Sequence, residues 1–172
     1  MMLNVSITGA RGLLGGRLAM GLASAGHSIR LLTRDSENMP PWAVAMDVRA
    51  VDIQDRQTLI DGLRGSDAVV HLASMNAQES AADPTAAQRV NVGGTRNTVE
   101  AAQSVGARRL LYMSTVHVYD APLQGAYQED SPTINCHPYA ETHHLAEDFV
   151  CGAKDIEGVV LRLSNGLGAP LD

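Results

Sequence analysis

The stretch TGARGLLG, residues 8–15, decides how the chain folds. It follows a short branched apolar run typical of a buried strand, and it opens residues 12–25, whose leucines recur at helical spacing. Gly9 permits a tight turn, Gly12 lets a diphosphate approach the backbone, and Gly15 allows close packing of helix on strand. The free amides and the dipole at the helix N-terminus favour an anion. The alternative is an ordinary glycine-rich turn.

The rest of the chain repeats this alternation of short apolar runs and longer helical stretches. Strands separated by helices pair in parallel through right-handed crossovers. We therefore expect an α/β fold: a doubly wound, Rossmann-like parallel sheet of strand order 3-2-1-4-5-6 in three α/β/α layers, with ligands at the carboxyl ends of the strands. After the first unit, strands are expected within 29–33, 44–53, 67–72, 108–114 and 159–163, helices at 56–64, 83–105 and 139–153, and loops at 38–41, 74–82 and 116–138.

Length and composition favour one globular domain and exclude several classes of protein. The chain has 172 residues, of which 45% are hydrophobic, enough to bury a core. Its net charge of −6 argues against a general nucleic-acid binder. No apolar run reaches the roughly 18 to 20 residues that span a bilayer, and the first residues lack the charged and apolar regions of a signal peptide. We therefore expect a cytoplasmic protein with no membrane partner, in which Cys136 and Cys151 are reduced thiols.

Seven short motifs follow one another along the chain. They are Gly9-x-x-Gly12-x-x-Gly15, Asp52-Ile53, His71-Leu72-Ala73, Asn91 to Thr95, Ser114 to Tyr119, Tyr139 with Glu147, and Arg162 with Asn165, Gly168 and Pro170. This series resembles the extended short-chain dehydrogenase/reductase family, which includes nucleotide-sugar epimerases, dehydratases and reductases. The resemblance covers the whole chain and implies that it binds NAD or NADP. Taken singly, His71 is as consistent with a core histidine, and Asn91 with a helix-face amide.

The resemblance also implies which residues surround the cofactor. In the family the glycine loop holds the diphosphate, the Asp-hydrophobic pair lies beside the adenine, and the His-Leu-Ala segment lines the cofactor. The implied cofactor-binding residues are Gly9, Arg11, Gly12, Leu13, Leu14, Gly15, Arg34, Asp52, Ile53, Leu72, Ala73, Ser74, Asn91, Ser114, Tyr139 and His143.

The end of the second strand bears on the choice between NAD and NADP. An acidic residue there accepts the ribose hydroxyls and selects NAD. Thr33 occupies that position here, followed by Arg34 and Asp35. Arg34 can pair with a 2′-phosphate, and the resemblance places Arg11 in the same region, so we favour NADP. The alternative is that both arginines are solvated surface charges and that Asp35 reaches the ribose.

The implied catalytic residues are Thr115, Tyr139 and His143. In the family a tyrosine at position 139 trades a proton with the substrate while the nicotinamide takes or gives a hydride. Thr115 occupies the position of a hydroxyl that hydrogen-bonds the same substrate oxygen. The family's lysine, which lowers the tyrosine pKa and holds the nicotinamide ribose, is replaced by His143. A histidine of ordinary pKa is mostly neutral at pH 7, unless a nearby carboxylate keeps it protonated.

Three interpretations of this replacement remain open. His143 substitutes for the lysine with a shifted pH profile, the protein binds nucleotide without turnover, or His143 points elsewhere and another group assists Tyr139. A metal site is not expected, because the adjacent His143 and His144 cannot point the same way on a helix, and His137 adds no metalloenzyme spacing. The chain also lacks the Gly-x-Ser-x-Gly elbow of serine hydrolases.

The resemblance implies a nucleotide-sugar substrate. Family members carry a smaller substrate domain after the Gly-Pro segment, so we expect residues 1–172 to form the dinucleotide-binding domain, with that second domain absent. The leading interpretation is the NAD(P)-binding domain of an epimerase, dehydratase or reductase. One alternative is a non-catalytic dinucleotide-binding or sensor protein. Another, also implied by the resemblance, is an oligomerisation module, in which the helices expected at 83–105 and 139–153, with the Ala-rich segment 81–102, pair in a homodimer.

Overall fold

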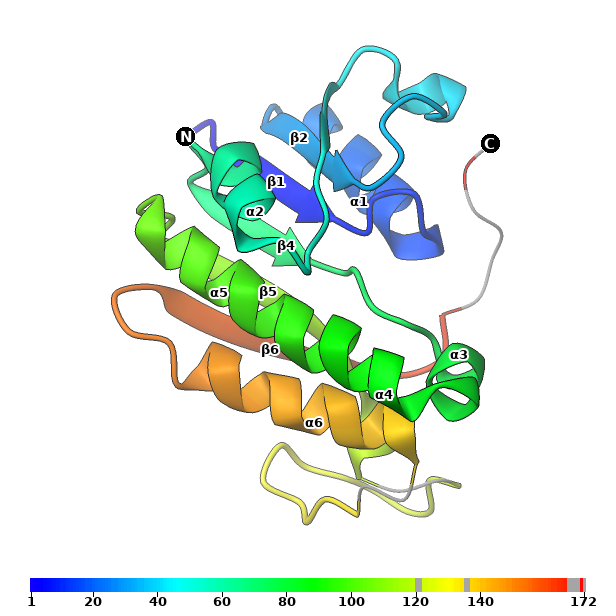
Figure 1. Cartoon of the computed structure of the whole chain (residues 1–172). Helices are drawn as coiled ribbons and strands as arrows, with labels where there is room; N and C mark the ends of the chain where they lie inside the picture. Colours follow the sequence, from blue (N-terminus) through cyan, green and yellow to red (C-terminus); the bar gives the residue numbers. More distant parts are fainter. Residues whose placement is uncertain (120–121, 135–136, 167–170, 172) are drawn as a thin grey trace.

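Six strands of the described residues form one parallel sheet, in the order β3-β2-β1-β4-β5-β6 (Figure 1). This computed structural model describes residues 1–119, 122–134, 137–166 and 171. The order and the parallel pairing confirm the expected doubly wound fold. The strands are β1 Asn4–Thr8, β2 Ser28–Thr33, β3 Asp47–Ala50, β4 Ala68–His71, β5 Arg109–Thr115 and β6 Glu157–Leu163.

Helices connect these strands and cover both faces of the sheet. They are α1 Leu13–Ser24, α2 Arg56–Leu63, α3 Ala77–Ala82, α4 Pro84–Ala87, α5 Gly94–Ser104 and α6 Pro138–Cys151, with the short segments η1 Pro41–Ala43, η2 Gln88–Gly93 and η3 Val116–Val118. On one face α2, α5 and α6 share a core with the sheet, and on the other α1 does so (Figure 1). No helix within the described residues is long and apolar enough to cross a membrane.

The single helix expected at 83–105 is interrupted in the structure. The Asp83 carboxylate caps α4 by accepting the backbone amide of Ala86 at 2.8 Å. Pro84 takes the first helical position, as the sequence indicates. The chain then widens into the π-helical segment η2 before α5 begins. The Thr95 hydroxyl donates to the carbonyl of Asn91 at 2.6 Å. This bond links the first turn of α5 to the preceding η2 segment.

Three expected loops contain short helices, and the loop expected at 116–138 begins with one of them, η3. Residues 74–82 hold α3, whose start is a capping box: the Asn76 side chain accepts the Glu79 amide, and the Glu79 carboxylate accepts the Asn76 amide, both at 2.9 Å. The loop expected at 38–41 ends with Pro41, which instead begins η1, a position where proline loses no hydrogen bond. The expected positions of the other elements are confirmed with small shifts at their ends.

Candidate functional site

Three glycines shape the turn from β1 into α1. Gly9 has a φ of +69°, and a Cβ on it would lie 2.7 Å from the backbone nitrogen of Ala73. A Cβ on Gly15 would lie 2.5 Å from the Cα of Ala10. The protein therefore fills the space at both positions. Gly12 differs, since among the described atoms outside its immediate chain neighbours a Cβ there would approach just the Gly9 carbonyl oxygen, at 3.3 Å. The exposed Gly12 thus leaves room for a ligand to reach the backbone.

The same turn presents the positive end of α1. Gly12 is the N-cap, and α1 begins with Leu13 and Leu14. No side chain of the described residues caps this helix, and its first turn contains no acidic residue. The first backbone amides and the helix dipole are consequently available to an anion such as a diphosphate.

The end of β4 borders the glycine loop. The Thr8 hydroxyl accepts the backbone amides of Leu72 and Ala73, at 3.2 and 3.3 Å. It also lies 2.7 Å from Nδ1 of His71, which is fully buried. Ser74 follows on the exposed side of the segment. The structure therefore brings Leu72 and Ala73 to the loop, whereas His71 is a hydrogen-bonded core histidine.

The charged residues beyond β2 pair with the glycine loop. Arg11 Nη1 lies 3.0 Å from a carboxylate oxygen of Asp35, and both side chains are half exposed. Hydrogen bonds from Asn38, supported by Arg11, hold the pKa of Asp35 below its ordinary value. Arg34 is exposed to solvent. The structure thus brings Asp35 to the loop, although the sequence favoured Arg34 and Arg11 as the readers of a 2′-phosphate.

Three other expected cofactor residues are engaged by the protein itself. The Asp52 carboxylate accepts an amide two residues further along, at 2.9 Å, and Ile53 is buried against α5. Asn91 is fully buried. Its Oδ1 accepts the Met75 amide at 2.7 Å, and its Nδ2 donates to the Thr142 hydroxyl at 3.0 Å. Asn91 therefore ties the segment before α3 to α6.

Ser114 is part of a buried polar network rather than an isolated hydroxyl. It donates to Oε1 of Glu147 at 2.5 Å, and Arg162 Nη2 lies 2.6 Å from Oε2 of the same carboxylate. The guanidinium also lies over the ring of Tyr119, 4.7 Å from its centroid, and donates to the carbonyl of Glu129 at 3.1 Å. Hydrogen bonds to Glu147 raise the pKa of Arg162 further. The network joins β5, α6, β6 and the loop after η3.

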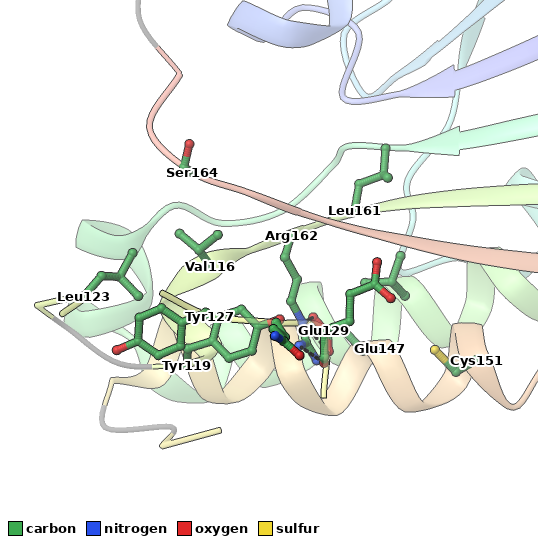
Figure 2. Close-up of a pocket in the computed structure, with 12 residues that line it drawn as sticks. Val116, Tyr119, Leu123, Tyr127, Glu129, Glu147, Cys151, Leu161, Arg162 and Ser164 are labelled. Atoms are coloured by element: carbon green, nitrogen blue, oxygen red, sulfur yellow. Dashed lines mark hydrogen bonds and ion pairs between the residues drawn. The ribbon is translucent and has the colours of Figure 1, made fainter. Parts of the chain in front are cut away.

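A pocket of about 670 Å³ lies against this network (Figure 2). The loop expected at 116–138 lines this pocket through Val116, Tyr119, Leu123 and Tyr127. Its buried charges, Glu147 and Arg162, are paired with each other. Of the last motif, Arg162 and Asn165 are described, whereas Gly168, Pro170 and, earlier in the chain, Cys136 lie outside the described residues.

Thr115, Tyr139 and His143 meet where β5 ends and α6 begins. His137 caps α6 by accepting the Tyr139 amide at 3.1 Å. Burial raises the pKa of the Tyr139 phenol, and a hydrogen bond with the Thr115 hydroxyl opposes that shift. The His143 ring lies one helical turn further on, with its centroid 4.4 Å from that of Tyr139 and the ring planes at 61°. The three expected catalytic side chains therefore do come together.

The surroundings of His143 bear on the charge state that the sequence left open. Burial lowers the pKa of His143 to about 4, and the Glu147 carboxylate only partly opposes this, so the ring is neutral at pH 7. Nδ1 lies 2.7 Å from the hydroxyl of Tyr112, and buried Nε2 has no hydrogen-bond partner among the described residues. The sequence analysis did not assign Tyr112. Its only signal was a single polar aromatic residue within an apolar strand.

The fold and this grouping define a Rossmann-like α/β domain with a glycine-loop cradle and a Tyr-His pair at one sheet edge. The chain belongs to the NAD dependent epimerase/dehydratase family, whose pattern matches residues 5–170. Among the described residues, no three His, Cys, Asp or Glu side chains are placed to hold a metal ion.

Known proteins similar to the chain include enzymes named for sugars and enzymes named for steroids. A UDP-glucose 4-epimerase of Streptomyces lividans is 29% identical over 89% of the chain and 48% of its own length. An L-arabinose 1-dehydrogenase (NAD(P)(+)) of Haloferax volcanii is 33% identical over 69% of the chain and 43% of its own. The structure of WbmG from Bordetella bronchiseptica, in complex with NAD and UDP, has a TM-score of 0.81 and 26% identity over 94% of the chain and 53% of its own. The chain thus spans about half the length of these relatives.

Proposed function

We propose that the chain is the NAD(P)-binding half of an oxidoreductase, epimerase or dehydratase that acts on a nucleotide sugar by tyrosine-assisted hydride transfer. The observation that carries the proposal is the grouping of Tyr139, Thr115 and the unpartnered Nε2 of His143 at the carboxyl end of the sheet that also bears the glycine loop. The UDP-glucose 4-epimerase of S. lividans supports the choice of substrate class.

Two features of the chain fit a dinucleotide. The glycine loop is closed to side chains at Gly9 and Gly15 but open at Gly12, which suits a diphosphate on the amides of α1. The buried Nε2 of His143 requires a polar partner, which suits a ribose hydroxyl. When bound, the nicotinamide would supply or accept a hydride at one carbon of the substrate. Tyr139 gives or takes the proton on the oxygen attached to that carbon.

The electrostatics support a proton-donor role for Tyr139. Because burial raises the pKa of Tyr139, its phenol keeps its proton through the neutral range. Neutral His143 adds no cation that would stabilise the phenolate. Tyr139 is therefore better suited to protonate a carbonyl oxygen than to deprotonate a hydroxyl, and Thr115 holds the same oxygen by a hydrogen bond.

For the cofactor we propose NADP, with exposed Arg34 and with Arg11 turned from Asp35 toward the 2′-phosphate. The ion pair of Arg11 with Asp35 favours a second candidate, NAD, because it places a carboxylate of lowered pKa beside the loop, ready to accept ribose hydroxyls. Competition between the two nucleotides for one site, measured by calorimetry, separates the candidates.

We also propose a homodimer through α5 and α6. Leu145 and Phe149 lie one turn apart on α6 and are 40% and 37% exposed, so this helix presents apolar surface. Sedimentation of the wild type and of Phe149→Glu tests this, and an unchanged monomeric mass in both would contradict it.

The main experiment has two stages. Calorimetry of the chain with NAD(H) and NADP(H) tests the cradle, and binding of neither would overturn the proposal. The second stage tests hydride transfer in the protein that contains this chain. UDP-sugars are added, and reduction of the bound nicotinamide is measured by its absorbance. Binding without any hydride transfer would support the non-catalytic alternative, which the neutral His143 favours.

A further inference from the structure

A row of buried polar side chains, here called the polar rung, crosses the core beneath the candidate site and consists of Thr8, His71, Tyr112 and His143. Thr8, His71 and Tyr112 are register partners on β1, β4 and β5. The Tyr112 ring stacks between those of His71 and His143, with centroids 5.7 Å apart on each side. His143 in turn contacts Tyr139. The rung therefore leads from the glycine-loop strand to the candidate catalytic tyrosine.

At the end of the rung nearer to the glycine loop, the position of the His71 ring hydrogen can be assigned from its hydrogen-bond partners. The Thr95 hydroxyl donates to the carbonyl of Asn91, so toward His71 Nε2, at 3.1 Å, it can only accept. His71 therefore carries its hydrogen on Nε2. Burial lowers the pKa of His71 to about 3, so its ring is neutral, and Nδ1 accepts from the Thr8 hydroxyl at 2.7 Å.

The outer part of the rung depends on Tyr112. Its hydroxyl lies 2.7 Å from Nδ1 of His143, and it is 2% exposed. Burial raises the pKa of Tyr112 far above its ordinary value, so the phenol retains its hydrogen and must donate it. Thr95 is the other hydroxyl near Tyr112, but within the described residues the hydrogen bond that the Tyr112 hydroxyl makes by distance and angle is the one to His143. Nδ1 of His143 is thus the acceptor that the geometry offers to Tyr112.

We propose that Tyr112 is a positioning residue: it holds His143 as the neutral Nε2–H tautomer and directs that N–H toward a ribose hydroxyl of the cofactor. A neutral imidazole that accepts at Nδ1 carries its hydrogen on Nε2, the buried atom without a partner among the described residues. Side chains on a helix lean toward its N-terminus, which for His143 is the direction of Tyr139 and the carboxyl ends of the strands. The proposal rests on the proposed function for the identity of the partner.

This arrangement keeps one of the two tasks of the family's lysine. A neutral N–H donor can hold a ribose hydroxyl, but it supplies no charge to lower the pKa of Tyr139. The direction of the donor is then set by a residue 31 positions away, and not by His143 itself.

The tautomer can be read directly by nitrogen NMR of the uniformly labelled chain at pH 7, with the His143 signals assigned by their loss in His143→Gln. We expect a pyrrole-like Nε2 bearing hydrogen and a pyridine-like Nδ1. Hydrogen on Nδ1, as when Tyr112 donates to Thr95, or on both nitrogens would overturn the proposal. This outcome does not depend on nucleotide binding, so it is distinguishable from failure of the proposed function.

The variant Tyr112→Phe tests the consequence, with Thr98→Val as a control that removes another buried hydroxyl, one bonded within α5. We expect Tyr112→Phe to give a mixture of His143 tautomers and to weaken nucleotide binding about three- to tenfold, the effect of one hydrogen bond. The control leaves both unchanged. A folded Tyr112→Phe that keeps a single Nε2–H tautomer contradicts the positioning role, and if this variant does not fold, the wild-type tautomer decides alone.

Discussion

The glycine loop and the Tyr139–His143 end of the site are built in opposite ways. The loop is defined by absent side chains, because backbone atoms occupy the space at Gly9 and Gly15 and leave it open at Gly12. The other end is defined by side-chain contacts between distant elements, such as Tyr112 with His143. The proposed diphosphate site therefore depends on local sequence, whereas the proposed proton chemistry depends on how the whole core is packed.

The largest effect is expected at the loop. Gly12→Val places a side chain where the diphosphate would lie, so nucleotide binding measured by calorimetry should be abolished while the fold is retained. Gly21→Ala in α1 is the matched control, because a Cβ there meets nothing within 4 Å. Wild-type affinity in Gly12→Val would show that the loop does not hold the diphosphate.

At the other end, a substitution should affect rate rather than binding. Tyr139→Phe removes the proton donor and should reduce hydride transfer by about 10² to 10⁴ in the active protein, with nearly unchanged nucleotide affinity. Steady-state rates and calorimetry on the same samples separate the two quantities. If Tyr139→Phe is fully active, the proposed mechanism does not apply.

Lowering the pH should destabilise the folded chain through His143, at the end of the site that is built from side-chain contacts. The pKa of this group is about 4 in the folded chain and 6.5 when unperturbed, so the unfolded state binds more protons between these values. Stability is therefore complete above pH 6.5 and falls as the pH drops toward 4, by about 3 kcal/mol from His143 alone. Urea unfolding across this range measures it, and His143→Gln should flatten the dependence. A slope unchanged in that variant would contradict the burial argument.

The smallest effect concerns nucleotide selectivity at the loop. If Arg34 reads a 2′-phosphate, Arg34→Ala should weaken NADP binding more than NAD binding, by about 1.5 to 3 kcal/mol for a lost charged hydrogen bond. Arg64→Ala, another exposed arginine, is the control. Equal losses for both nucleotides would make Arg34 a surface charge and leave the ribose to Asp35.

The sequence was sufficient to predict the features that follow a local pattern of residues. Periodicity predicted the strands and their order, and glycine spacing predicted the loop between β1 and α1. The π-helical segment η2 was missed because it leaves the apolar spacing of the sequence unchanged. The sequence left the charge of His143 open and gave no sign of its contact with Tyr112, because burial is set by packing between elements far apart in the chain.

The polar rung has a consequence for how the sheet assembles. Hydrophobic strands such as β4 and β5 offer several alignments of similar apolar burial, and a slip by one residue turns every side chain to the other face. Such a slip would separate His71 from Thr8 and Tyr112 and leave buried polar groups without partners. A sheet with misaligned strands would lose the hydrogen bonds that orient His143, and it would therefore be less stable. Correct pairing of the strands and correct orientation of His143 thus depend on the same contacts.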